Sequence, residues 1–146
     1  MKMRIAGVVL AASLAALLLP GLADSSGRRA ITIEFEKDCP ELTCEETASS
    51  PVDVSTVVTP VDVEGELFHY TAVETFSSPR GSVTVSLVGI LKMDKKPQVT
   101  LLNGWVVRGS WDGVALAGAK VEARAIRVGD STVFAGWVRI KPPRAG

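Results

Sequence analysis

An alternation of apolar and polar residues in segment 81–91 is the feature that most constrains the fold of this chain. Val83, Val85, Leu87 and Leu91 fall on one parity, and the serines and threonine between them fall on the other. Successive side chains of a β-strand point to opposite faces, so this period predicts a strand with one buried face. Further segments with the same period follow, and they predict a sheet that continues towards the C-terminus.

The same period recurs in the rest of the chain and predicts more strands. Pro51 and Pro60 flank one of them, which predicts a short or edge strand there. Gly65 is a candidate β-bulge inside another. Segment 37–51 is expected to be an acidic loop, in which 41–48 is compatible with one helical turn. The expected strands are 30–36, 52–58, 61–76, 82–91, 98–108, 119–128 and 132–140.

The length and spacing of these strands predict the fold class. Long strands joined by short turns favour an antiparallel meander, and no ten-residue segment shows a helical period with caps. A sheet of this size must fold over or close on itself to protect its edges. We therefore predict an all-β domain that forms an antiparallel up-and-down β-barrel of about eight strands. A two-sheet β-sandwich is the alternative.

The N-terminus has the pattern of a secretory signal peptide. Lys2 and Arg4 precede an apolar run over 5–19, and small residues follow at the positions that a signal peptidase reads. The run is shorter than the roughly 20 residues of a membrane span, which argues against a membrane anchor. We predict cleavage near Ala23 and a secreted product, extracellular or periplasmic, that leaves the membrane. The predicted parts are a signal peptide over 1–23 and one secreted β-barrel domain over 24–146.

The two cysteines of the chain, Cys39 and Cys44, are predicted to form a disulfide bond. Two cysteines in an exported chain most often pair. Their C-x4-C spacing differs from the C-x-x-C of redox sites and indicates a clasp on a loop. Closing so short a loop stabilises the fold by about 2 kcal/mol in the chain-entropy model.

The net charge of zero hides an uneven distribution. Segment 30–79 holds eleven acidic residues and one basic residue, Lys37, whereas segment 80–146 holds eleven basic and four acidic residues. One interpretation is that the two halves lie side by side and neutralise each other across strand pairs. The other is an acidic face that binds a cation or a basic partner. No run of five basic residues occurs, so nothing in the sequence indicates nucleic-acid binding.

Glu74 is the most informative single residue of the chain. It shares its parity with Tyr70, Phe76 and other apolar residues of segment 61–76. An unpaired carboxylate on a buried face would cost several kcal/mol, so Glu74 must meet an arginine, a water-filled cavity or the open end of the sheet. If it faces an apolar cavity, it is also a candidate acid or base.

A ligand site inside the barrel would combine apolar walls with a few polar groups. Tyr70, Phe76 and Trp105 are the candidate walls, and Glu74 and Asn103 are the candidate polar anchors. No metal or cofactor site is predicted, because one histidine and two cysteines do not make a usual zinc or copper site. There is also no G-x-S-x-G elbow and no phosphate-binding loop.

Motifs in the C-terminal half give a family resemblance. They are the G-S-V-T-V strand at 81–85, the G-S-W-D-G turn at 109–113, the A-G-A element at 117–119 and the closing F-A-G-W-V-R-I strand at 134–140. Together they resemble the second half of the allene oxide cyclase-like and dirigent-like barrels. That family usually has two glycines and a threonine where this chain has Gly-Ser-Trp. The resemblance implies a closed barrel with an apolar lumen and a lipophilic ligand or substrate, but the catalytic residues of the family have no counterpart here.

Three functions are compatible with these observations. The first is a secreted barrel that binds a small lipophilic molecule in its lumen. The second is a cyclase or isomerase on the same barrel, with Glu74 as the acid or base. The third is a structural or surface interaction domain that has no ligand and docks a partner through its acidic half. A further alternative is a structural domain whose aromatic side chains all lie in the core.

Overall fold

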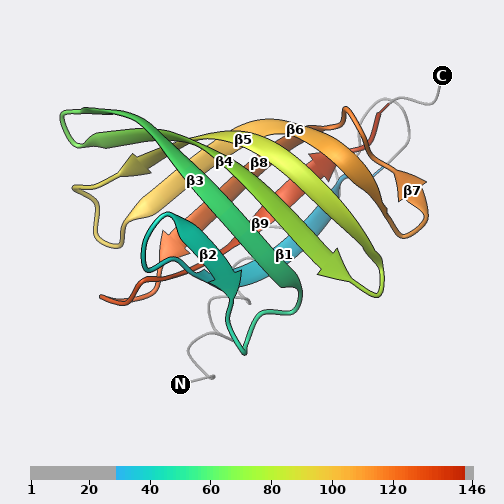
Figure 1. The fold of residues 1–146 in the computed structure, drawn as a ribbon, viewed down its shortest axis with the longest axis horizontal. Helices are drawn as coiled ribbons and strands as arrows, with labels where there is room; N and C mark the ends of the chain where they lie inside the picture. The colour runs from blue at the N-terminus through green and yellow to red at the C-terminus, as the bar shows by residue number, and fades with distance from the viewer. Residues whose placement is uncertain (1–28, 144–146) are drawn as a thin grey trace.

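Nine antiparallel strands form one sheet that closes on itself (Figure 1). The computed structural model describes residues 29–143. Eight strands make the barrel, and β7 is a short addition to β6. The strands are β1 (Ile31–Asp38), β2 (Thr43–Glu46), β3 (Asp53–Glu64), β4 (Leu67–Ser78), β5 (Gly81–Lys92), β6 (Val99–Trp111), β7 (Val114–Ala115), β8 (Lys120–Arg127) and β9 (Val133–Lys141).

The connectivity is that of an up-and-down barrel. From β1 to β6 each strand pairs with the next along the chain, and β6 then pairs with β8 and β8 with β9. Closure comes from β1, which pairs with β9 along its whole length from Ile31 to Asp38. The predicted fold is therefore confirmed, and a two-sheet sandwich does not form.

Within residues 29–143 no helix is long and apolar enough to cross a membrane. The predicted signal peptide lies outside the described residues.

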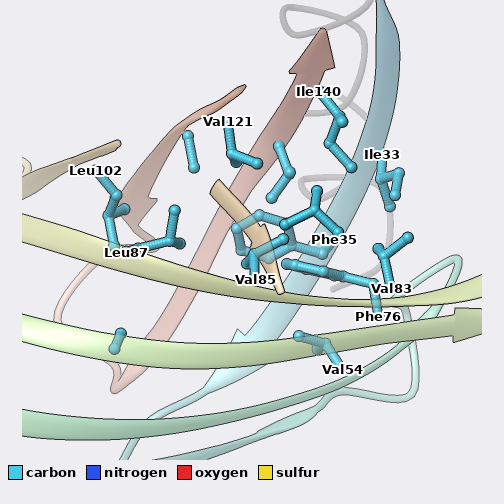
Figure 2. Close-up of a cluster of buried hydrophobic side chains, with 14 of the residues drawn as sticks. Ile33, Phe35, Val54, Phe76, Val83, Val85, Leu87, Leu102, Val121 and Ile140 are labelled. Carbon is cyan, nitrogen blue, oxygen red and sulfur yellow. The ribbon is translucent and has the colours of Figure 1, made fainter. Parts of the chain in front are cut away.

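The apolar parities of β1, β4, β5 and β8 point into the barrel as predicted. Phe35 of β1 and Phe76 of β4 face each other in the interior, with ring centroids 5.5 Å apart (Figure 2). Trp111 and Leu116 are fully buried in the same cluster. The interior of this part of the barrel is a continuous apolar core, and burial of large apolar side chains is the main favourable term in its folding.

The segment predicted as one strand over 61–76 is instead a hairpin. Gly65 has φ +61° and lies in the turn between β3 and β4, so its prediction as a bulge is wrong. The register shift occurs between Pro60 and Asp62. Proline lacks the N–H that a regular ladder needs, and a bulge tolerates it. For this reason β3 continues through Pro60, and the short strand predicted between two prolines is a strand of 12 residues.

The segment compatible with a helical turn, 41–48, forms β2 instead. β2 pairs with β1 on one side and with β3 on the other, so it completes the barrel wall. Cys44 points inward from β2 and is buried. A single helical turn without an apolar face gains little from packing, whereas the strand satisfies its backbone groups on both sides.

The inward face of β6 is opposite to the one that carries the candidate ligand-site residues Asn103 and Trp105. Thr100, Leu102 and Val106 are buried, whereas Trp105 and Val107 are exposed. Both parities of this strand are apolar, so the register with β5 and β8 decides which one points inward. β6 carries an irregularity against the Thr84/Val85 step of β5, where the register shifts.

Candidate functional site

The barrel interior has a cavity at one end. A cavity of about 110 Å³ lies beneath the loop that the disulfide closes. Its apolar wall comes from strands on several sides of the barrel: Val58, Phe68, Ala72, Leu91, Leu102 and Phe134. Its polar lining is Lys37, Glu41, Thr56, Tyr70 and Thr100. The wall is therefore mostly apolar, with a few polar groups, as in known small-molecule sites.

A buried ion pair adjoins this cavity. Lys37 of β1 and Glu74 of β4 form a salt bridge through Nζ and Oε2, and the side chain of Glu74 is 0% exposed. The Thr56 hydroxyl donates a hydrogen bond to the same carboxylate oxygen at 2.8 Å, and Lys37 Nζ donates to Thr56 Oγ1 at 3.3 Å. The partner of Glu74 is therefore a lysine and not the predicted arginine. Glu74 Oε1 has no hydrogen-bond partner among the described residues.

Tyr70 and Thr100 supply a second polar group in the cavity. Their hydroxyls are hydrogen-bonded to each other across the interior. The pKa of Tyr70 is raised from its ordinary value to about 12. Burial is the largest cause, and the nearby charge of Glu74 acts in the same direction. The hydrogen bond with Thr100 lowers the pKa, but by less than burial raises it. The phenol is therefore neutral at physiological pH.

Gly89 makes room for the Tyr70 ring. The two residues are cross-strand partners on β5 and β4. A Cβ atom at position 89 would lie 2.4 Å from Cζ of Tyr70, which is closer than carbon atoms approach each other. The phenol can reach Thr100 because this position carries no side chain.

The disulfide loop covers the cavity. Cys39 and Cys44 are bonded, with an S–S distance of 2.03 Å, so the predicted disulfide is confirmed. Cys39 N donates to Thr132 O at 3.0 Å, and Val58 N donates to Leu42 O at 2.7 Å. These bonds attach the loop to the β8–β9 turn and to β3. The roof is thereby held on two sides of the barrel mouth.

The five predicted ligand-site residues separate into three environments. Tyr70 lines the cavity, and Glu74 lies next to it, bonded to two lining residues. Phe76 lies in the packed core with no exposed surface. Trp105, which is 53% exposed, lies on the outer wall, and Asn103 shares its parity there. The structure therefore does not bring Asn103 and Trp105 together with the other three, because β6 presents its other face to the interior.

Three polar residues of the cavity were missed by the sequence reasoning. Lys37 continues the inward parity that begins at Ile33 and Phe35, and extending the first strand by one step would have found it. Thr56 continues the parity of Val54 in the same way. Thr100 had no such signal, because both faces of β6 are apolar.

Comparison with protein-family models, with curated proteins and with solved structures finds no match to this chain. The likeness to the allene oxide cyclase-like and dirigent-like barrels rests on its sequence motifs and stays a prediction. In the described part of the chain, no three His, Cys, Asp or Glu side chains gather where they could hold a metal ion.

Proposed function

We propose that the barrel binds a small amphipathic molecule in the cavity beneath the disulfide loop. The observation that carries this proposal is the composition of the cavity: its wall is mostly apolar, and its polar groups are Lys37, Glu41, Tyr70 and two threonines. The apolar part of the ligand would lie against Phe68, Leu91 and their neighbours, while its head group meets the polar side chains. With the predicted signal peptide, this binding would take place outside the cytoplasm.

The size of the cavity limits the ligand. Pockets for drug-sized molecules typically hold about 300–1,000 Å³, and this cavity holds about 110 Å³. A single water needs roughly 10–15 Å³ of such space. The ligand is therefore larger than one water molecule but has only a short apolar chain.

The charge balance of the ion pair favours a neutral head group. Lys37 Nζ donates to Glu74 and to Thr56, and an ammonium group has three N–H donors, so one donor is left for a ligand. Glu74 already balances the charge of the lysine. A carboxylate ligand would add an uncompensated negative charge at low dielectric. A ketone, aldehyde or alcohol oxygen accepts the hydrogen bond without that cost.

The contacts of Glu74 favour binding over catalysis. Its partners Lys37 and Thr56 line the cavity, but Glu74 itself does not. An acid or base must come within hydrogen-bond reach of the proton that it moves. A cyclase or isomerase mechanism would need a movement that brings Glu74 Oε1, which has no hydrogen-bond partner among the described residues, into the cavity.

The test is an isothermal calorimetric titration of the protein with linear methyl ketones and the corresponding secondary alcohols of increasing chain length. We expect affinity to rise with chain length and then to fall when the chain exceeds the cavity. Ala72→Met, which fills the cavity from its wall, should abolish binding. Val73→Met on the same strand points outward and should leave binding intact. Equal affinity of the native and Ala72→Met proteins would refute the site.

Native mass spectrometry of the protein purified from its own host gives an independent test. A co-purified small molecule is expected in the native protein and absent from Ala72→Met. Recovery of the same molecule with both proteins would place it elsewhere on the chain.

A further inference from the structure

The outer wall of the barrel has a second concave site, separate from the interior cavity. A shallow cleft of about 420 Å³ lies over β6, β8 and β9, which are neighbours in the sheet (Figure 1). Its lining includes Asn103, Trp105, Lys120, Glu122, Arg139 and Lys141. Three of these residues are basic and one is acidic, so the cleft is positively charged.

The sheet register places the two lysines directly opposite each other. Trp105 pairs with Lys120 across β6 and β8, and Lys120 pairs with Lys141 across β8 and β9. Like charges at directly opposite positions repel each other and destabilise a sheet. Neither lysine has an acidic partner among residues 29–143. An anion between the two ammonium groups would remove this repulsion.

The acid in the cleft does not neutralise the lysines. Glu122 Oε1 accepts a hydrogen bond from Arg139 Nη1 at 3.0 Å, and the side chain of Arg139 is 10% exposed. Arg139 Nε has no hydrogen-bond partner in the described part of the chain. Glu122 therefore serves to hold the guanidinium group at the cleft, and the charges of Lys120 and Lys141 stay open to an anionic ligand.

Trp105 adds an aromatic surface beside the lysines. It is 53% exposed, and it lines the cleft next to Lys120, its cross-strand partner. An exposed indole packs against aromatic or sugar rings, and the adjacent ammonium groups attract an oxyanion.

We propose that this cleft binds an oxyanion attached to a ring, such as an aryl phosphate or a phosphorylated sugar. The anion would lie between Lys120 and Lys141, and the ring would pack on Trp105. The site does not depend on the interior cavity, because the two sites share no lining residue.

The test uses phenyl phosphate and glucose phosphate as probes, with inorganic phosphate and phenol as partial probes, in calorimetry at low salt. Both ring-bearing phosphates should bind more tightly than inorganic phosphate or phenol. Lys141→Gln should weaken binding about tenfold, the usual cost of losing one hydrogen bond to a charged group. Lys95→Gln, which removes an exposed lysine in the β5–β6 turn, is the matched control and should bind as the native protein does.

Thermal unfolding separates a binding role from a structural one. Because Lys120 and Lys141 repel each other, Lys141→Gln should melt at the same temperature as the native protein or higher, although it binds the probe less well. Trp105→Leu should reduce the affinity for phenyl phosphate to that for inorganic phosphate. The proposal is overturned if no probe binds, if Lys95→Gln and Lys141→Gln lose affinity equally, or if Trp105→Leu binds phenyl phosphate as the native protein does.

Discussion

Breaking the buried ion pair of Lys37 and Glu74 should cost far more stability than replacing it. In Lys37→Met, the fully buried Glu74 carboxylate loses its cation and keeps the hydrogen bond from Thr56 at 2.8 Å. Removing one partner of a buried pair costs about 3–5 kcal/mol. We expect the lower end of that range, because the Thr56 bond remains and the adjoining cavity can admit water.

The double variant Lys37→Met, Glu74→Met should recover most of this loss. Two methionines fill a similar volume without any buried charge, and such replacements are often neutral or stabilising. The Thr56 hydroxyl would lose its acceptor, which costs about 1–3 kcal/mol. We therefore expect the free energy of unfolding of the double variant to lie within about 2 kcal/mol of the native value.

Urea unfolding followed by tryptophan fluorescence measures these free energies by linear extrapolation. Lys95→Met is the control, because that lysine is exposed, and it should change stability by less than about 0.5 kcal/mol. The reasoning is refuted if Lys37→Met costs no more than this control. It is also refuted if the double variant loses the sum of the two single losses. If Lys37→Met does not fold at all, recovery of a folded double variant still decides the question.

Three further predictions concern the cavity and its roof. The pKa of Tyr70 is raised to about 12, so its contribution to stability should be fully present below pH 10 and disappear as the pH rises to about 12. Because Tyr70 is the sole tyrosine, absorbance of the tyrosinate reports it directly, and titration near the ordinary value would contradict its burial. Gly89→Ala should push the Tyr70 ring away from Thr100 and cost about 1–3 kcal/mol by overpacking, measured by urea unfolding; an unchanged midpoint would contradict the close contact. Cys39→Ala with Cys44→Ala should cost about 2 kcal/mol and weaken ketone binding in calorimetry, whereas retained affinity would show that the roof is not needed.

The fold could be predicted because most strands have one polar and one apolar parity. In β8, Val121, Ala123 and Ala125 are buried, and the residues between them, such as Lys120 and Glu122, are charged or polar on the outside. A register slip of one residue would bury those charges, so the sequence alone determines the face. The number of strands was less well determined by the sequence, because β2 was expected to be part of a loop and the turn at Gly65 was expected to be a bulge within one strand.

The candidate site could be predicted only in part, because β6 has no such asymmetry. Leu102 and Val106 on one parity and Trp105 and Val107 on the other are equally apolar, and only the pairing with neighbouring strands decides which points inward. That pairing involves residues far apart in the chain. The inward position of Lys37, by contrast, could have been predicted from the sequence, because Lys37 lies on the same parity as the buried residues Ile33 and Phe35 of β1.

The cavity follows from the distribution of residue size along the barrel. At the packed end, Phe35, Phe76 and Trp111 fill the interior. At the other end, Ala123 and Ala125 of β8 lie directly opposite Leu102 and Thr100, which line the cavity. A larger side chain at Ala72 of β4, which lines the cavity, would fill the space, and an empty cavity costs stability in proportion to its volume. The unfilled space beside Lys37 and Tyr70 gives up packing energy at this end of the barrel, which supports the proposal that a small ligand completes the core there.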